Sequence, residues 1–331
     1  MKNLMKSAAL AVAVSLCASS MAFAEESVRL SGSGASFPAP IYLTWFKDFS
    51  KKTAGVTVDY QSKGSGAGVQ DFLNKTVDFA ASDSAMKDED IAKVAEGVQL
   101  LPMTAGEIDQ LIAARDKSGL LVAEAYMIVH HPQWIRAREL VQGGAIGQLR
   151  HIDAAFSYNN ADDLQNIRNR PETGGGGIRD IGVYTYGSAR FVSGGEGEVI
   201  TCRMIRENGV DVWAEVDAIL QGPLGRATYT AMTSMRLQNR QEVTFHGDKG
   251  LLKVANGPFN ANLFAEARIE LHQDQTVTSE RWPAANHYKL QVEAFGHSIR
   301  TGAPYACPLE FTKGTQVMID RAFETARDIS L

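Results

Sequence analysis

The sequence predicts two fold classes in succession: an α/β fragment as far as about residue 107, then an α+β domain with a large, mostly antiparallel open sheet. In the first part, short strands and helices alternate across glycine- and serine-rich loops, the order expected of a parallel sheet with crossover helices. In the second part, several segments alternate apolar and polar residues with a period of two, which is typical of strands with one buried face. A length of 331 residues with 44% hydrophobic and 21% charged residues suits a globular chain of this size.

The first 24 residues have the pattern of a secretory signal peptide. Lys2 and Lys6 supply positive charge, an apolar run extends from Ala8 to Leu16, and Ala22-Phe23-Ala24 has the small-x-small pattern of a cleavage site. We therefore expect cleavage after Ala24 and delivery to the periplasm or the medium. No later window is apolar enough for a membrane span, so none is expected in the mature chain.

Short apolar runs between polar loops predict the elements of the first part in the order strand, helix, repeated three times. The expected strands are Val28–Leu30, Val56–Tyr60 and Asp78–Ala81, and the expected helices run from Pro40 through Phe49, from about Gly68 to Lys75, and from Asp88 to Ala95. Because a helix separates each strand from the next, the strands are expected to pair in parallel.

Three loops of this part follow the ends of the predicted strands and carry polar side chains. Ser36 lies in GSGASFPAP, Ser65 in SKGSGAGV and Asp83 in VDFAASDSAM. Backbone N–H groups at a helix N-terminus favour an anion, and a carboxylate beside it would accept a hydrogen bond from a protonated oxyanion such as hydrogen phosphate. The alternative is that these loops are ordinary turns and that Asp83 caps a helix.

These three strings resemble the periplasmic phosphate-binding proteins of Pst-type transporters, over residues 25–107. The resemblance implies a partial lobe of the periplasmic-binding-protein fold, in which Ser36, Ser65 and Asp83 contact phosphate. That family completes its site with an arginine and a Ser-Gly-Thr loop from a later segment, and no Ser-Gly-Thr occurs in this sequence. Half of the ligand shell and the second lobe are therefore expected to be missing.

The remaining residues, 108–331, predict a different arrangement. Val210–Leu220 shows its pattern most clearly, because valines and alanines alternate there with charged residues and a tryptophan. The expected helices are Ile108–Ser118, Gln133–Gln142, Ile178–Val192, Tyr288–Arg300 and Thr312–Arg327, and the expected strands are Leu120–Val129, Arg150–Tyr158, Val199–Ile205, Val210–Leu220, Ala227–Thr233, Glu242–Phe245 and Gly250–Val254.

The string GGGGIRDIGVY, residues 174–184, carries the densest chemistry of this part. Its glycines would permit a close approach of the backbone to a ligand. Asp180 and Tyr184 are spaced i, i+4 in the expected helix, so both side chains are predicted on one face of it. A carboxylate beside a phenol in a cleft could orient a substrate hydroxyl and pass its proton, although a surface pair or a core tyrosine would show the same spacing.

The string EAYMIVHHPQW, residues 124–134, followed by GGGGIRDIGVY and then the period-two strands, resembles the Gfo/Idh/MocA family of oxidoreductases. In this resemblance residues 108–129 correspond to the last helix and strand of a nucleotide-binding domain. The rest corresponds to a C-terminal domain that binds a sugar or polyol and forms homodimers through its open sheet. Asp180 and Tyr184 match the D-x-G-x-[H/Y] catalytic motif of the family.

The family's cofactor, NAD(P), needs a G-x-G-x-x-G loop that the sequence lacks. Gly32 and Gly34 are followed by Phe37 where the third glycine belongs. Gly64 and Gly66 also have the first spacing of the motif, but Val69 stands at the position of the third glycine. No Lys-Pro dipeptide occurs either, so the catalytic lysine of the family's Glu-Lys-Pro string has no counterpart. NAD(P) is therefore expected not to bind this chain alone, and hydride transfer is expected to be weak or absent.

Together these features predict a chimera: a substrate and dimerisation domain for a sugar or polyol, fused to an exported phosphate-binding fragment. The alternatives are a periplasmic phosphate-binding protein and a non-functional fusion or sequence-assembly artefact. A net charge of −5 without a basic run makes nucleic acid an unexpected partner. The three cysteines lack zinc-type spacing, so no metal site is expected, and whether Cys202 and Cys307 pair stays open.

Overall fold

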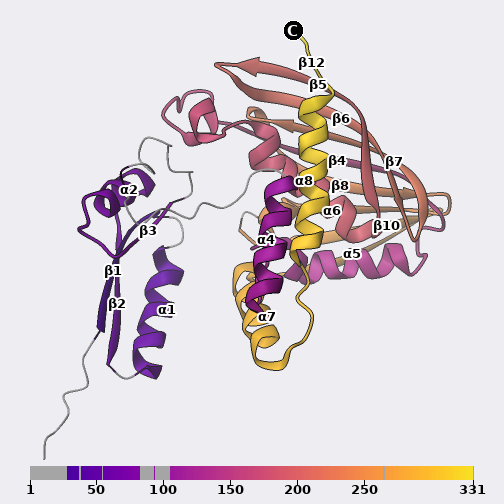
Figure 1. Ribbon diagram of the computed structural model, residues 1–331. Helices are drawn as coiled ribbons and strands as arrows, with labels where there is room; N and C mark the ends of the chain where they lie inside the picture. The colour runs from indigo at the N-terminus through magenta and orange to yellow at the C-terminus, as the bar shows by residue number, and fades with distance from the viewer. Residues whose placement is uncertain are drawn as a thin grey trace, which may run out of the picture. The chain divides into compact units, whose positions relative to one another are not determined.

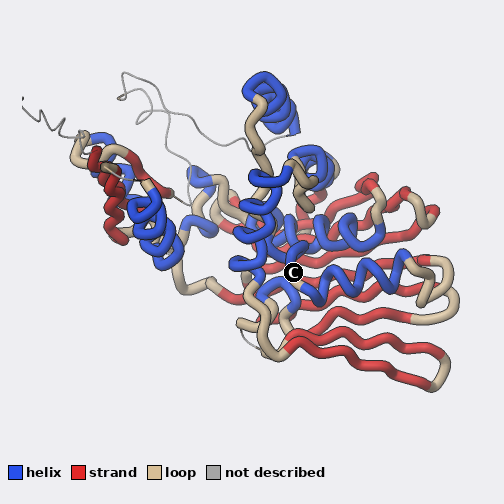
Figure 2. Tube along the Cα trace, turned by 90° about the horizontal axis from the view of Figure 1, so that it is seen from below, coloured by secondary structure: helices blue, strands red, loops and turns tan. Residues whose placement is uncertain are grey.

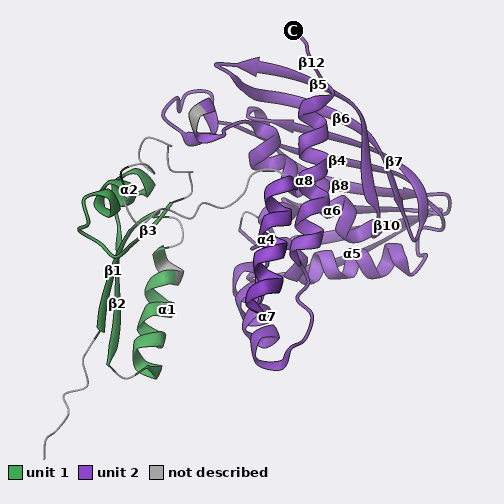
Figure 3. Ribbon diagram, in the orientation of Figure 1, with its two compact units in different colours: residues 1–97 green, residues 98–331 purple. Residues whose placement is uncertain are grey.

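A computed structural model describes residues 28–36, 39–53, 55–82, 93, 105–263 and 265–330. The chain divides into two compact units, residues 1–97 and residues 98–331, shown in separate colours in Figure 3. Within the described ranges, no helix has both the length and the apolar composition needed to cross a membrane.

Unit 1 holds a three-stranded sheet in the order β2-β1-β3, with every pairing parallel (Figure 1). Its strands are β1 (Val28–Gly34), β2 (Val56–Ser62) and β3 (Phe79–Ala81), and its helices are α1 (Ala39–Lys52) and α2 (Ser65–Leu73). The parallel α/β prediction is therefore confirmed for this segment. The predicted helix Asp88–Ala95 lies outside the described residues, apart from Lys93.

Glycines let the helix α2 and the strands of unit 1 pack closely. Gly34 has a φ of 138°, and a Cβ there would collide with the carbonyl oxygen of Ala81. A Cβ on Gly68 of α2 would collide with the Cα of Gly34. Gly34 and Gly68 therefore allow a close contact between backbone segments of the protein itself.

Unit 2 holds a nine-stranded sheet in the order β11-β10-β9-β8-β4-β7-β6-β5-β12. Its pairings are antiparallel except β4 with β7 and β5 with β12, so the predicted large, mostly antiparallel sheet is confirmed. The strands are β4 (Leu149–Asn159), β5 (Glu196–Glu207), β6 (Val210–Gly222), β7 (Gly225–Ser234), β8 (Arg236–Gly247), β9 (Leu251–Ala255), β10 (Ala267–Gln273), β11 (Thr276–Trp282) and β12 (Ala326–Asp328).

The helices of unit 2 gather on one face of this sheet and leave the other face open (Figure 2). In β6, Val216 and Ala218 of the covered face are buried, while Glu215, Asp217 and Ile219 of the open face stay partly exposed. The helices are α4 (Ala105–Ser118), α5 (Pro132–Gln142), α6 (Val183–Ser193), α7 (His287–Thr301) and α8 (Leu309–Glu324), with short turns at η1 (Met127–His130), η2 (Ile167–Asn169), η3 (Pro171–Thr173), η4 (Ile178–Gly182) and η5 (Pro258–Asn260).

The predicted strand Leu120–Val129 is wrong. Within it only Ala123 forms an isolated bridge, to Pro308, and its end folds into the 3₁₀ turn η1. Leu120 is 69% exposed. The apolar composition of this segment is typical of a buried strand. Because no neighbouring strands of the described chain lie on both sides of it, its backbone cannot form a hydrogen-bonded ladder, and its end forms a 3₁₀ turn.

The strands β10 and β11 were not predicted, and the last helix begins and ends three residues earlier than expected. β10 and β11 form a hairpin whose turn contains Asp274 in the left-handed region at φ 51°. The predicted helix Thr312–Arg327 ends at Glu324, and β12 follows it in parallel pairing with β5. The end of the chain therefore belongs to the sheet as well as to the helical layer.

Candidate functional site

Asp180 lies in η4, a π-helical turn that leads into α6. The glycine run before it allows Asp211 of β6 to approach: Gly176 has a φ of 121°, and a Cβ there would collide with the Asp211 carboxylate. That carboxylate accepts a hydrogen bond of 2.7 Å from the backbone N–H of Ile178. We expected these glycines to let a ligand approach the backbone. In the structure the Asp211 side chain takes that place and anchors the start of the turn.

Both carboxylate oxygens of Asp180 are engaged. The Tyr158 hydroxyl donates to Oδ2 at 2.6 Å, and the Arg168 guanidinium donates from Nε to Oδ1 at 2.7 Å. Burial raises the pKa of the Tyr158 phenol, and the Asp180 charge raises this pKa further, so the phenol keeps its proton. We call Tyr158, Asp180 and Arg168 the Asp180 cluster.

Tyr184, the predicted partner of Asp180, lies in the first turn of α6. Its hydroxyl is directed at the Met127 sulfur, 4.0 Å away, and among the described residues no hydrogen bond joins it to Asp180. Its ring packs 5.8 Å from those of Phe156 and Phe259. Burial is the main cause of its raised pKa, and the Asp180 charge contributes, so the two side chains lie within electrostatic reach.

The π turn explains why an i, i+4 spacing does not give a bonded pair here. A π-helical turn takes more residues than an α-helical one, so side chains four apart no longer stand directly above each other. The sequence carried no signal for this turn. It did place Tyr158 at the end of a predicted strand and Arg168 in a polar loop, but it did not bring them to Asp180.

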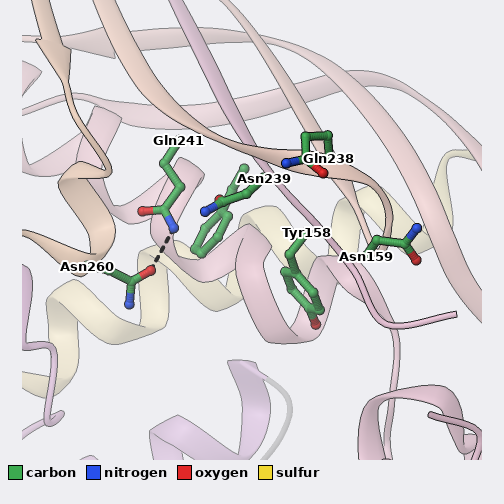
Figure 4. A pocket seen from close by; sticks show the side chains of 7 residues that line it. Tyr158, Asn159, Gln238, Asn239, Gln241 and Asn260 are labelled. Atoms are coloured by element: carbon green, nitrogen blue, oxygen red, sulfur yellow. Dashed lines mark hydrogen bonds between the residues drawn. The ribbon is translucent and has the colours of Figure 1, made fainter. Parts of the chain in front are cut away.

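A pocket of about 400 Å³ adjoins the Asp180 cluster, and Tyr158 belongs to both. Figure 4 shows its lining side chains, which come from β4, β8 and η5. Five of the seven lining residues carry amide groups; the lining residues are Phe156, Tyr158, Asn159, Gln238, Asn239, Gln241 and Asn260.

The amides of this pocket are partly fixed by each other. Gln241 donates from Nε2 to Oδ1 of Asn260 at 2.6 Å, and it stands opposite Phe156 in the register of β4 and β8. Its buried Oε1 has no hydrogen-bond partner within the described structure. Sequence reasoning missed these residues, since the only available signal was an unusually polar stretch, LQNRQ, at positions 237–241.

Two of the three residues predicted to contact phosphate lie within the described part of unit 1. Ser36 is exposed and comes just after β1, Ser65 is the first residue of α2, and Asp83 lies outside the described residues. Gly34 pairs with both Ser62 and Ala81 in the parallel register, so all three strands end at one edge of the sheet. The loops that carry the two serines therefore share that edge.

The loop nearest to a dinucleotide fingerprint does not fit a pyrophosphate. A Cβ on Gly32 would meet the ring of Phe79, and the corresponding space at Gly34 is filled by the Ala81 carbonyl. These glycines make room for side chain and backbone of the protein itself, and position 37, where a third glycine is required, is phenylalanine.

The two cysteines of unit 2 do not pair. Cys202 and Cys307 are free and fully buried. Burial is the main cause of the raised pKa of each thiol, that of Cys202 to about 12.

Comparisons with known proteins match the two parts of the chain to two families. Residues 134–253 match the model of the GFO/IDH/MocA C-terminal domain, and residues 22–123 match that of the PBP superfamily domain. An uncharacterised oxidoreductase from Rhizobium meliloti is 32% identical over 229 residues, which cover 66% of this chain and 66% of that protein. A D-xylose 1-dehydrogenase (NADP⁺) from Haloferax volcanii is 29% identical over 68% of this chain and 69% of that protein.

The first part of the chain matches a different protein. The phosphate-binding protein PstS of Pasteurella multocida is 43% identical over 83 residues, which cover 25% of this chain and 24% of that protein.

Among solved structures, a 3-ketoreductase from Actinomadura kijaniata in complex with NADP and TDP-benzene has a TM-score of 0.66 at 19% identity, covering 92% of this chain and 99% of that one. This last likeness concerns the fold. The chain spans about two thirds of the oxidoreductase relatives and a quarter of the phosphate-binding one.

Proposed function

We propose, from the premise that this chain joins a GFO/IDH/MocA C-terminal domain to a segment of the PBP superfamily, that unit 2 binds a sugar or polyol. The observation that carries the proposal is the amide-lined pocket beside the Asp180 cluster. The similarity to a D-xylose 1-dehydrogenase from Haloferax volcanii supports the same substrate class.

The chemistry of the pocket suits hydroxyl groups. A side-chain amide offers both donors and an acceptor, and a sugar hydroxyl can also donate and accept, so the two groups match in pairs. Phe156 and Tyr158 add apolar ring surface against which C–H groups of a sugar can pack. Polar groups placed among aromatic rings are the usual composition of a small-molecule site.

Asp180 and Tyr184 stay our candidates for the catalytic residues. Asp180, held by Tyr158 and Arg168, would orient a substrate hydroxyl and accept its hydrogen bond. Loss of hydride from a sugar needs an acceptor, the space beside Gly32 and Gly34 is filled by Phe79 and Ala81, and unit 1 lacks the third glycine of the NAD(P) loop. The chain alone is therefore proposed to bind its carbohydrate with weak catalysis or none.

The test is calorimetric titration of the full chain with D-xylose, D-glucose, glycerol and myo-inositol. At least one of them should bind, and Gln241→Ala should weaken its binding about tenfold, the value of one or two hydrogen bonds. Gln275→Ala, a change of the same kind on the exposed β10–β11 turn, is the matched control and should leave the affinity unchanged. If none of the four binds, the proposal fails.

For unit 1 we propose contact with phosphate through Ser36, Ser65 and Asp83, in a chain exported to the periplasm by its first 24 residues. The observation that favours it is the common sheet edge at which β1 and β2 end. Titration with inorganic phosphate should give saturable binding that Ser65→Ala weakens. Sulfate is the matched control ion and should not compete.

If neither phosphate nor carbohydrate binds, the remaining alternative is the non-functional fusion. Phosphate binding without carbohydrate binding would favour the phosphate-binding protein instead.

A further inference from the structure

We infer that the ligand of the amide-lined pocket is an uncharged sugar or polyol, without a phosphate or a nucleotide diphosphate. This inference rests on the proposed function and narrows it. The proteins similar to this chain include a D-xylose dehydrogenase and a reductase solved with a TDP compound, so the relatives leave the choice open.

The lining itself provides no formal charge. Among the seven residues that line the pocket, five carry amides, one is a phenylalanine and one a tyrosine. Sites that hold phosphate groups in proteins normally provide arginine, lysine or a row of free backbone N–H groups. An anion moved from water into this lining would give up its hydration for neutral partners alone.

The arginines that flank the pocket are already paired with carboxylates. Arg236 and Arg240 stand on either side of Gln238 and Asn239 in β8. The Arg236 guanidinium binds Glu207 at 2.8 Å and also donates to Asn160, Asn169 and the Met235 carbonyl.

Arg240 forms its ion pair with Glu242, and Arg168 forms its ion pair with Asp180. In each of these three arginines a carboxylate lies against the guanidinium and offsets its charge. A phosphate beside any of them would therefore also be repelled by that carboxylate.

A ligand that binds to the Tyr158 hydroxyl must donate the hydrogen bond. The Tyr158 hydroxyl donates its single proton to Asp180, so its oxygen can only accept a hydrogen bond from a ligand. The unpartnered Oε1 of Gln241 is likewise an acceptor. A sugar hydroxyl provides the missing proton, whereas the oxygens of a diphosphate at neutral pH provide none.

The size of the pocket agrees with a small ligand. At about 400 Å³ it lies near the lower end of the range of roughly 300–1,000 Å³ common for small-molecule sites. A single sugar ring is a better match to such a space than a sugar joined to a nucleotide.

The experiment compares each neutral ligand with a charged counterpart on the full chain. D-glucose is titrated beside glucose 6-phosphate and dTDP-glucose, and D-xylose beside xylose 1-phosphate. Each titration is repeated in Gln241→Ala, so that binding at the pocket is separated from any phosphate binding by unit 1. We expect the neutral sugar to bind at least about tenfold more tightly at the Gln241-dependent site.

A gain-of-function variant provides the second arm. Gln238→Arg places an unpaired cation at the exposed rim of the pocket and should raise the affinity for glucose 6-phosphate at least about fivefold, while Gln275→Arg should not.

Tighter Gln241-dependent binding of glucose 6-phosphate or dTDP-glucose than of glucose would overturn the inference and leave carbohydrate binding standing. Binding of no carbohydrate in either form would overturn the proposed function and the inference together.

Discussion

Asp211 is 1% exposed, yet it carries the carboxyl group that fixes the start of the π turn. Burial raises its pKa to about 6, against an ordinary value near 4. Between these two pH values the folded protein binds a proton that the unfolded chain has released. The contribution of Asp211 to stability therefore falls as the pH rises from about 4 to about 6, by about 2–3 kcal/mol in total.

Asp211→Asn removes this titration and keeps an oxygen that can accept from the Ile178 N–H. We expect the free energy of unfolding of the variant, minus that of the wild type, to increase between pH 4 and pH 6 and to be flat above pH 7. Urea denaturation at a series of pH values measures this difference, in which other titrating groups cancel. A difference that is constant across the series would contradict the assigned pKa.

Tyr158 shows how one residue can join two features of the molecule. Its ring lines the pocket, and its hydroxyl completes the shell of Asp180. A ligand hydroxyl that donates to the Tyr158 oxygen would extend a chain of hydrogen bonds that ends at the Arg168 guanidinium. Asp180 is thus the link between the pocket and a cation that does not line it.

At the scale of elements, the π turn and its glycine run depend on one close contact. In Gly176→Ala the new methyl group meets the Asp211 carboxylate, and φ 121° is unfavourable for any L side chain. We expect a loss of stability of about 2–4 kcal/mol, measured by thermal or urea unfolding, and weaker carbohydrate binding because Asp180 shifts with its turn.

Gly144→Ala is the matched control for this change. Gly144 also has a positive φ, 80°, but a Cβ there would have nothing within 4 Å. It should lose only the backbone part, about 1 kcal/mol, and keep its ligand affinity. Equal losses in the two variants would show that the contact with Asp211 is unimportant.

Elements with regular periodicity could be predicted from the sequence, and their contacts could not. The alternation in Val210–Leu220 gave β6 and its buried face, and the strand–helix order gave the parallel sheet of unit 1. β8 starts at Arg236, ahead of the predicted Glu242, because its polar residues line a pocket and so break the alternation. The period-two pattern from which a strand is predicted is therefore absent from this stretch.

The site was predictable only in part, for a related reason. Asp180 was found through its motif, but its bonds to Tyr158 and Arg168 depend on a π turn and on the loop between β4 and η4. Gln241 meets Asn260 only after the β8–β9 hairpin has formed. Contacts of this kind follow from tertiary packing, which local spacing does not encode.

At the scale of the whole molecule, the open face of the nine-stranded sheet is the surface through which we expect unit 2 to form a homodimer. Glu215, Asp217 and Ile219 of β6 lie on this face. Ile219→Lys would place a charge within the expected interface, and burying an unpaired charge there would weaken association strongly. Light scattering after size-exclusion chromatography should give a dimer for the wild type and a monomer for this variant.

Ile299→Lys is the control, since Ile299 is 61% exposed on α7, a helix that packs against η1. It should stay dimeric. A wild-type monomer, or a dimer that only Ile299→Lys disrupts, would place the interface elsewhere or remove it.

The parallel pairing of β12 with β5 has a practical consequence for anyone who handles the protein. Proteolytic clipping after Glu324 would strip β12 away and leave the amide and carbonyl row of β5 around Cys202 and Met204 without its neighbour. An unpaired edge strand can pair with strands of other molecules, so we expect the cleaved protein to aggregate. The amide-lined pocket would remain intact. Turbidity in an ageing sample should therefore be traced first to the carboxyl-terminal end by mass spectrometry.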